Sequence, residues 1–126
     1  MSILSDIISA LGDALGVPVV ALVPPERPGL FVTVERTGGA STRFIDAGQY
    51  AVQAWAASML EAETLMTRVR EAVWQLCRLP WVAFVQVGSC YNFPDPDGRQ
   101  QRFQCVCEIH VMQDLGGEPD GETNEK

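Results

Sequence analysis

Four cysteines and a single histidine are the residues of this chain whose types could support covalent chemistry. Cys105 and Cys107 stand two residues apart, and His110 follows three residues later. A cysteine nucleophile needs a base such as histidine within hydrogen-bond reach. Residues 102–112 alternate between polar and apolar side chains, which predicts a β-strand with His110 on the opposite face from both cysteines. We therefore expect no catalytic cysteine–histidine pair here, and His110 reads as a surface residue beside Glu108.

The same two cysteines fit a zinc site poorly. Zinc ligands usually come in pairs separated by two to four residues, with a second pair elsewhere in the chain. The alternation places Cys105 and Cys107 on the inward face with Phe103, Ile109 and Val111, where cysteine behaves as a small hydrophobe. We expect a non-enzymatic protein without metal or cofactor. A small cysteine-dependent enzyme or metal-binding domain, drawing on Cys77 and Cys90 from elsewhere in the fold, is the alternative from a different class.

Two further motifs resemble ligand sites without completing them. Asp95 and Asp97 lie in a proline-rich segment, residues 92–101, but the rest of the calcium-loop pattern is absent, so a solvated turn is the simpler interpretation. Gly38 and Gly39 follow a predicted strand, but neither a helix nor a Lys-Ser or Lys-Thr pair comes after them. A phosphate-binding loop is therefore not predicted.

The composition limits the class of protein. The 126 residues are 47% hydrophobic and 20% charged, which is typical of one globular domain. The formal net charge of −7 speaks against unaided nucleic-acid binding, which needs a basic surface. We find no membrane span and no secretion signal, so a reducing cytoplasmic setting with free thiols is expected. Residues 114–126 hold five acids and one base, and we interpret 113–126 as a disordered acidic tail after a single domain at 1–112.

The elements that must position these residues are read from hydrophobic spacing. Residues 2–15 predict a first helix, capped by Ser2 or Ser5 and ended by Gly16. Ser58 and Glu61 form a capping box before a long second helix. The apolar stripe of that helix comprises Ala62, Leu65, Met66, Val69, Val73 and Leu76. We predict an α+β fold, with two helices packed on a mixed or mainly antiparallel sheet of four to five strands in one two-layer domain.

Strands are expected at 17–22, 30–36, 50–56, 82–89 and 102–112. Thr37 to Ala40 predict a hairpin tip, because two glycines can adopt the positive backbone angles of a tight turn, with residues 43–46 as the return strand. Residues 82–89 are apolar on both faces, Val82 and Phe84 on one and Ala83, Val85 and Val87 on the other, which favours a central position in the sheet.

Trp55 falls on the strand face opposite the predicted helix layer. We expect Phe31 and Val106 to share that face. A monomer would leave the face in water and an oligomer would bury it, so Trp55 is the main internal indication of self-association.

The order of these features resembles the tail terminator (tail-completion) proteins of long-tailed bacteriophages. The resemblance covers residues 3–112 and rests on short motifs taken in order. They are P-x-x-F-V-T-V-x-R-T-G-G at 28–39, A-W-A at 54–56, E-A-x-x-L at 61–65, V-R-E-A-V at 69–73, P-D-P-D at 94–97 and R-F-Q-C-V-C-E-I-H-V at 102–111. The cysteines at 105 and 107 depart from the plain apolar residues expected on that strand. Head-closure or adaptor proteins of the phage neck are comparably small and form the runner-up.

The resemblance implies a virion protein of the tail or neck, assembled in the host cytoplasm. Such proteins form a ring, usually a hexamer, that stops growth of the tail tube and offers the surface that joins the head. The expected partners are further copies of this chain, the tail tube protein and a head-completion or connector protein, while DNA passes through the lumen without specific binding. Ring closure joins two different surfaces of each subunit. Our candidates for them are Thr37, Gly38, Gly39, Arg43, Trp55, Tyr91, Asn92, Asp95 and Asp97.

Overall fold

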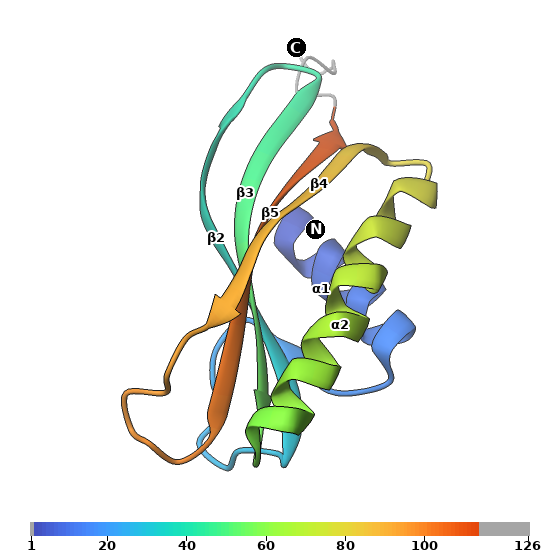
Figure 1. The fold of residues 1–126 in the computed structure, drawn as a ribbon. Coiled ribbons are helices and arrows are strands. Elements are labelled where there is room, and N and C mark those ends of the chain that lie inside the picture. The colour runs from blue at the N-terminus through green and yellow to red at the C-terminus, as the bar shows by residue number, and fades with distance from the viewer. Residues whose placement is uncertain (1, 114–126) are drawn as a thin grey trace.

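Two helices cover one face of a strongly twisted five-stranded sheet, as Figure 1 shows for the computed structural model, which describes residues 2–113. The elements in chain order are α1 Ile3–Leu15, β1 Val19–Val20, β2 Leu30–Ser41, β3 Ile45–Ala56, α2 Met59–Gln75, the short 3₁₀ helix η1 Leu76–Arg78, β4 Val82–Asn92 and β5 Gln101–Met112. The α+β class with two helices and a mixed sheet is confirmed. The predicted acidic tail lies outside the described residues.

The sheet order is β1-β2-β3-β5-β4. Only β1 runs parallel to its neighbour β2, and the other pairs are antiparallel. The long strand β3 lies in the middle and pairs with β5 along its whole length. The prediction that residues 82–89 form a central strand is wrong, because β4 lies at the edge.

Bulges explain why the side-chain pattern of β4 was misread. Its register shifts between Val82 and Phe84, so Val82 and Val85 both reach the core while Phe84 is 42% exposed. The predicted grouping of Val82 with Phe84 on one face is therefore also wrong. An extra residue in a strand changes which face the following side chains take.

Both helices begin where local sequence predicts. The Ser2 side chain accepts a hydrogen bond from the Ser5 amide, and Gly16 ends α1 in the left-handed region at φ 70°. Ser58 caps α2 by accepting from the Glu61 amide, and its hydroxyl donates to the Glu61 carboxylate at 3.3 Å, so the Glu61 side chain contacts the cap hydroxyl rather than the Ser58 amide of a full capping box. Every predicted stripe residue of α2, up to Leu76 in η1, is buried.

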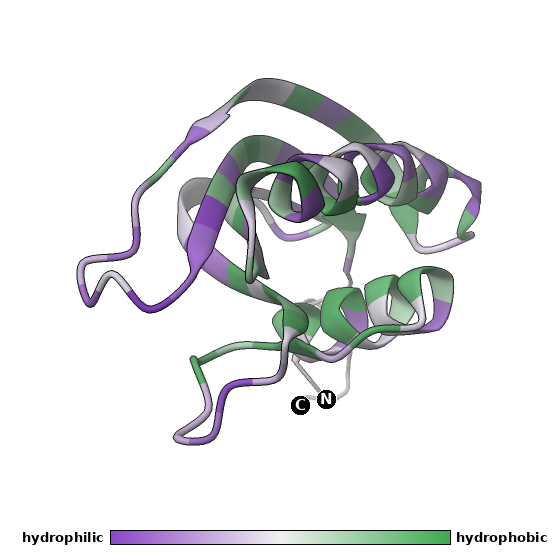
Figure 2. Ribbon diagram, turned by 60° about the horizontal axis from the view of Figure 1, so that its bottom comes forward, coloured by the Kyte–Doolittle hydropathy of each residue, from purple (hydrophilic) through white to green (hydrophobic). Residues whose placement is uncertain are grey.

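The core lies between the sheet and these helices. Ile7 and Leu11 of α1 meet Leu65 and Val69 of α2 over the inner side chains of β2, β3 and β5. Figure 2 shows the apolar character of α1 and the polar character of the loops at the end of the sheet near the viewer. No helix in the described part of the chain has both the length and the apolar character needed to span a bilayer.

The predicted hairpin tip at Thr37 to Ala40 is wrong. Gly38 and Gly39 stay within β2 opposite Gln49 and Gly48, past a bulge between Arg36 and Gly38. Gly39 has φ 111°, and a Cβ there would lie 2.1 Å from the Ala47 carbonyl oxygen, so the glycine serves close strand approach.

The true turn is residues 42–44. The Thr42 hydroxyl accepts hydrogen bonds from the amides of Phe44 and Ile45 at 3.3 and 3.0 Å. A threonine side chain that bonds the following backbone in this way stabilises a turn without glycine. Of the predicted return strand at 43–46 only residues 45 and 46 form a strand, and they belong with residues 50–56 to the one strand β3.

Candidate assembly surfaces

The face of the sheet opposite the helices carries an aromatic pair that is already buried within one chain. Phe31 and Trp55 stack with ring centroids 5.3 Å apart and planes 9° from parallel. Trp55 is 2% exposed and Phe31 is fully buried. The expectation that a monomer leaves Trp55 in water is therefore wrong, and almost none of its surface remains for a partner.

Arg102 covers Trp55 and holds the loop between β4 and β5. Its guanidinium lies 4.8 Å from the Trp55 ring centroid and 4.2 Å from that of Phe93. The same group donates hydrogen bonds of 2.7 Å to the backbone carbonyls of Phe93 and Pro94. Burial lowers the pKa of Arg102, and the nearby Asp95 carboxylate opposes that effect. A cation held between two aromatic rings fixes where this loop leaves the sheet.

Asp95 organises the rest of that loop from inside. Its side chain is 2% exposed and accepts hydrogen bonds from the backbone amides of Asp97, Arg99 and Gln100. Arg27, 68 residues earlier, pairs with Asp95 at 2.7 Å and with Asp97 at 2.8 Å. The interpretation of this pair as a solvated turn is wrong for Asp95 and right only for Asp97, whose side chain is 60% exposed.

The pKa of Asp95 reflects these contacts. Burial raises it, but the hydrogen bonds from the Asp97 amide, from Arg27 and from the Gln100 amide outweigh burial, and the pKa lies below its ordinary value. The carboxylate is thus charged at neutral pH and keeps its role as an acceptor for the loop.

A row of polar side chains crosses four strands next to this loop. The Trp55 indole donates to the Thr33 hydroxyl at 3.0 Å, and Thr33 donates to Gln53 at 2.9 Å. The row continues from Gln53 to Gln104 and from Gln104 to the Tyr91 hydroxyl, each at 2.6 Å. Tyr91 is 40% exposed, so the row ends at the surface of the edge strand β4.

The opposite end of the sheet projects as the β2–β3 hairpin, visible at the top of Figure 1. On its helix side Arg36 pairs with the buried Asp46 at 2.6 Å and lies over the Tyr50 ring. The pKa of Arg36 is raised, mainly by its hydrogen bond to Asp46. Phe44 at the turn is 60% exposed, with Arg43 over its ring.

Cys105 and Cys107 lie in the hydrophobic core. Cys105 is fully buried and Cys107 is 5% exposed, which confirms their expected inward orientation. Burial raises the pKa of both, and that of Cys107 reaches about 12. The His110 ring lies 4.8 Å from the Phe84 ring at a tilt of 50°, and its Nε2 is 3.4 Å from Glu108, as its outward orientation predicts. No cluster of metal-ligating side chains occurs among residues 2–113.

The predicted site residues thus fall into two groups at opposite ends of the sheet. Thr37, Gly38, Gly39 and Arg43 lie on the projecting hairpin, and Tyr91, Asn92, Asp95 and Asp97 lie with Trp55 at the other end. Gly38 pairs with Gln49, and Tyr91 pairs with Gln104, which faces Gln53, so these members of the two groups are four residues, about 13 Å, apart along β3. The structure does not bring the groups together within one chain.

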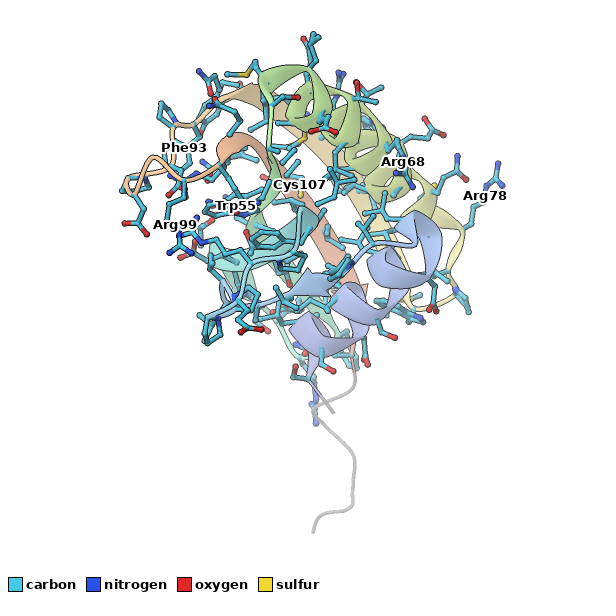
Figure 3. All side chains as sticks on the ribbon, turned by 90° about the horizontal axis from the view of Figure 1, so that it is seen from below. Trp55, Arg68, Arg78, Phe93, Arg99 and Cys107 are labelled. Carbon is cyan, nitrogen blue, oxygen red and sulfur yellow. The ribbon has the colours of Figure 1, made fainter. Side chains whose placement is uncertain are left out.

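The sequence analysis did not identify Arg27 and Arg102, which hold the loop between β4 and β5. Figure 3 shows Phe93 and Trp55 together on the side of the molecule away from Arg78. Arg102 could have been noticed as a charge on an outward position two residues from the loop and level with Trp55. No local signal points to Arg27, because its partners are far away in the sequence.

Comparisons with known proteins show which other protein has a similar fold. No family description and no curated protein sequence matches this chain. Among solved structures, a chain from the "Virion of native gene transfer agent (GTA) particle" superimposes with a TM-score of 0.60 and 12% sequence identity, over 87% of this chain and 92% of that chain. The described domain therefore has the fold of a protein found in a gene transfer agent virion.

Proposed function

We propose that this chain is a structural protein of a phage-like virion, and that it works as a tail terminator. The observation that carries the proposal is the shared fold with a gene transfer agent virion protein, over nearly the full length of both chains. The ordered motifs of residues 28–111 support the same class independently. The finer role comes from those motifs and goes beyond the structural likeness.

In this role the chain makes a ring, hexameric as is usual in the family it resembles, on the head-proximal end of the tail tube. The ring stops tube growth and offers the surface for a head-completion or connector protein. Because its net charge is −7, the ring does not bind the phosphates of DNA that passes through its lumen. A head-closure or adaptor protein of the neck is the second candidate, since it would use the same small fold.

Two open sheet edges support head-to-tail self-association. The eleven residues of β4 include no charged residue and no proline, so two of the usual protections of an edge strand are missing and its bulges are the protection that it has. On the other side β1 covers only Val32 and Thr33, so the rest of β2 has no outer neighbour among the described residues. A ring needs two different surfaces per subunit, and these edges lie on opposite sides of the sheet. The hairpin turn and the loop of residues 91–98 extend them.

The test is assembly, measured on the full chain. Replacing Arg43 and Phe44 together by serine removes the exposed contact of the hairpin turn without touching the core. We expect a lower solution mass by sedimentation and fewer capped tube ends in negative-stain images. Leu60→Ser, a change at an equally exposed position on α2, is the matched control and should assemble normally.

Two outcomes would contradict the proposal. One is a wild-type chain that stays monomeric when offered tail tubes, and the other is turnover of a substrate by the purified protein. Trp55→Ala is a poor test of the interface, because its burial makes misfolding the expected result.

A further inference from the structure

The exposed face at the end of α2 concentrates positive charge in an otherwise acidic domain. Residues 68–78 contain three arginines and one glutamate, whereas the remaining described residues contain five arginines and ten acids. Arg70 and Trp74 are four residues apart in α2, so they are neighbours on one side of that helix, and Arg78 follows at the end of η1. We call these three residues the Arg–Trp stripe.

The stripe is open to a ligand. Arg70 and Arg78 are exposed and form no ion pair with residues 2–113, and Trp74 between them is 43% exposed. Arg68 differs, because its guanidinium donates to the Leu15 carbonyl at the end of α1. Figure 3 shows the Arg78 side chain pointing away from the body of the protein. Aromatic residues and arginine are the side chains most enriched in binding surfaces.

The chain itself supplies a segment of matching charge. Residues 114–126 carry four of the seven net negative charges: five acids, Asp114, Glu118, Asp120, Glu122 and Glu125, against one Lys. The end of α2 adds only about half a negative charge from its free carbonyls, which the arginines of the stripe outweigh. Leu115 and Pro119 offer apolar surface for the exposed indole.

The segment starts within reach of the stripe, after Gln113, whose amide donates to the Phe44 carbonyl at the β2–β3 turn at 2.8 Å. The amide of Met112 donates to the Trp81 carbonyl at 2.9 Å, and Trp81 is three residues beyond Arg78. Thirteen residues span up to about 40 Å when extended. The eight residues from Arg70 to Arg78 rise only about 12 Å along a helix. The segment therefore reaches the whole stripe of its own chain.

We propose that residues 114–126 bind the Arg–Trp stripe of the same chain, through ion pairs to Arg70 and Arg78 and contact with Trp74. The bound segment covers the outer side of α2 and neutralises its only concentrated positive charge. Such a contact is controlled by ionic strength, because the Debye length falls from about 10 Å at 0.1 M salt to about 3 Å at 1 M. The proposal is independent of the virion role argued above.

A nitroxide on Cys77, an exposed residue of η1 beside Arg78, provides the measurement. The full chain carries Cys90→Ser so that Cys77 is the only accessible thiol, and amide relaxation of residues 114–126 is recorded by NMR. In 50 mM salt we expect strong broadening of these amides, reduced at least twofold in 1 M salt. The double change Arg70→Gln with Arg78→Gln should reduce the broadening by a similar factor.

The control removes one positive charge elsewhere. Arg99→Gln alters an exposed arginine in the loop between β4 and β5 and should leave the broadening unchanged, whereas Arg78→Gln alone should reduce it. Mixing spin-labelled chains that lack isotope label with isotope-labelled chains that lack the spin label tests whether the segment binds its own chain. Absence of broadening, equal loss in Arg78→Gln and Arg99→Gln, or broadening in the mixed sample would each overturn the proposal, the last because it would place the segment on a neighbouring chain.

Discussion

Gln53 of β3 donates a hydrogen bond of 2.6 Å from its side-chain amide to the side-chain carbonyl of Gln104 directly opposite on β5. Gln104 is 9% exposed and in turn donates a hydrogen bond to the Tyr91 hydroxyl. The two glutamines thereby connect the buried Trp55 region to the free edge of the sheet. Most of this face has polar side chains that satisfy one another, so it needs no helix to cover it.

Replacing Gln104 by alanine should destabilise the fold by about 1–2 kcal/mol, because the Gln53 amide then loses its partner on a largely buried face. Urea unfolding of the single changes Gln53→Ala and Gln104→Ala and of the double change gives the coupling energy, which we expect to be about 0.5–1.5 kcal/mol. Additive effects would mean that the bond does not contribute.

The two adjacent glycines of β2 should respond very differently to alanine. Gly39→Ala puts a Cβ 2.1 Å from the Ala47 carbonyl oxygen at φ 111°, and we expect a loss of about 2 kcal/mol or more. Gly38→Ala meets only the Gln49 side chain at 3.4 Å and should cost less than about 1 kcal/mol. Thermal unfolding of both variants measures the difference, and equal losses would contradict the described strand pairing.

Asp95→Asn should destabilise the protein by about 3 kcal/mol, since it breaks a buried ion pair and leaves Arg27 without its inner partner. Asp97→Asn is the matched control: it faces the same arginine but is exposed, so a cost below about 1 kcal/mol is expected. Urea midpoints at pH 7 decide between these expectations.

The same carboxylate predicts a pH dependence. The pKa of Asp95 is lower in the folded chain than its ordinary value near 4, so its contribution is fully present above about pH 4 and is lost as the pH falls through the folded pKa. Stability should therefore fall more steeply with acid in the wild type than in Asp95→Asn. Parallel pH profiles would show that the pair carries little of the acid sensitivity.

The thiol chemistry gives a direct test of whether Cys105 or Cys107 is a reactive nucleophile. With the pKa of Cys107 at about 12, about one thiol in ten thousand is ionised at pH 8. In a Cys77→Ser, Cys90→Ser variant, labelling of Cys105 and Cys107 by a disulfide reagent should be at least a hundredfold slower than in urea. Rapid labelling of either residue in the folded chain would favour the enzyme alternative.

Local patterns predicted what local interactions determine. The capping residues Ser2 and Ser58, the stripe of α2 and the alternation of β5 all depend on neighbours within a few residues, and these predictions are confirmed. The edge position of β4 depends on pairing with β5, and the buried state of Trp55 depends on Arg27 and Arg102. Such contacts join distant segments, so no local window contains them.

The prediction of a hairpin tip at Thr37 to Ala40 failed for a different reason. Two glycines are a strong turn signal, but here Gly39 serves close strand approach and Thr42 makes the turn with its side chain. The candidate residues on the hairpin and the loop were correctly placed on the surface in part only: Gly38, Asp97 and Tyr91 are accessible, and Trp55 and Asp95 are not. Whether any of them meets another subunit stays a prediction.

The bulge before Gly38 allows the projecting hairpin to change length without losing its alignment. Arg36 faces Tyr50 and Gly38 faces Gln49, so Thr37 has no counterpart on β3. Deleting Thr37 would keep every other cross-strand pair, whereas deleting a residue elsewhere in β2 would turn the side chains beyond it to the opposite face. A loss of this one residue would straighten the hairpin and redirect the exposed Phe44 without disturbing the core.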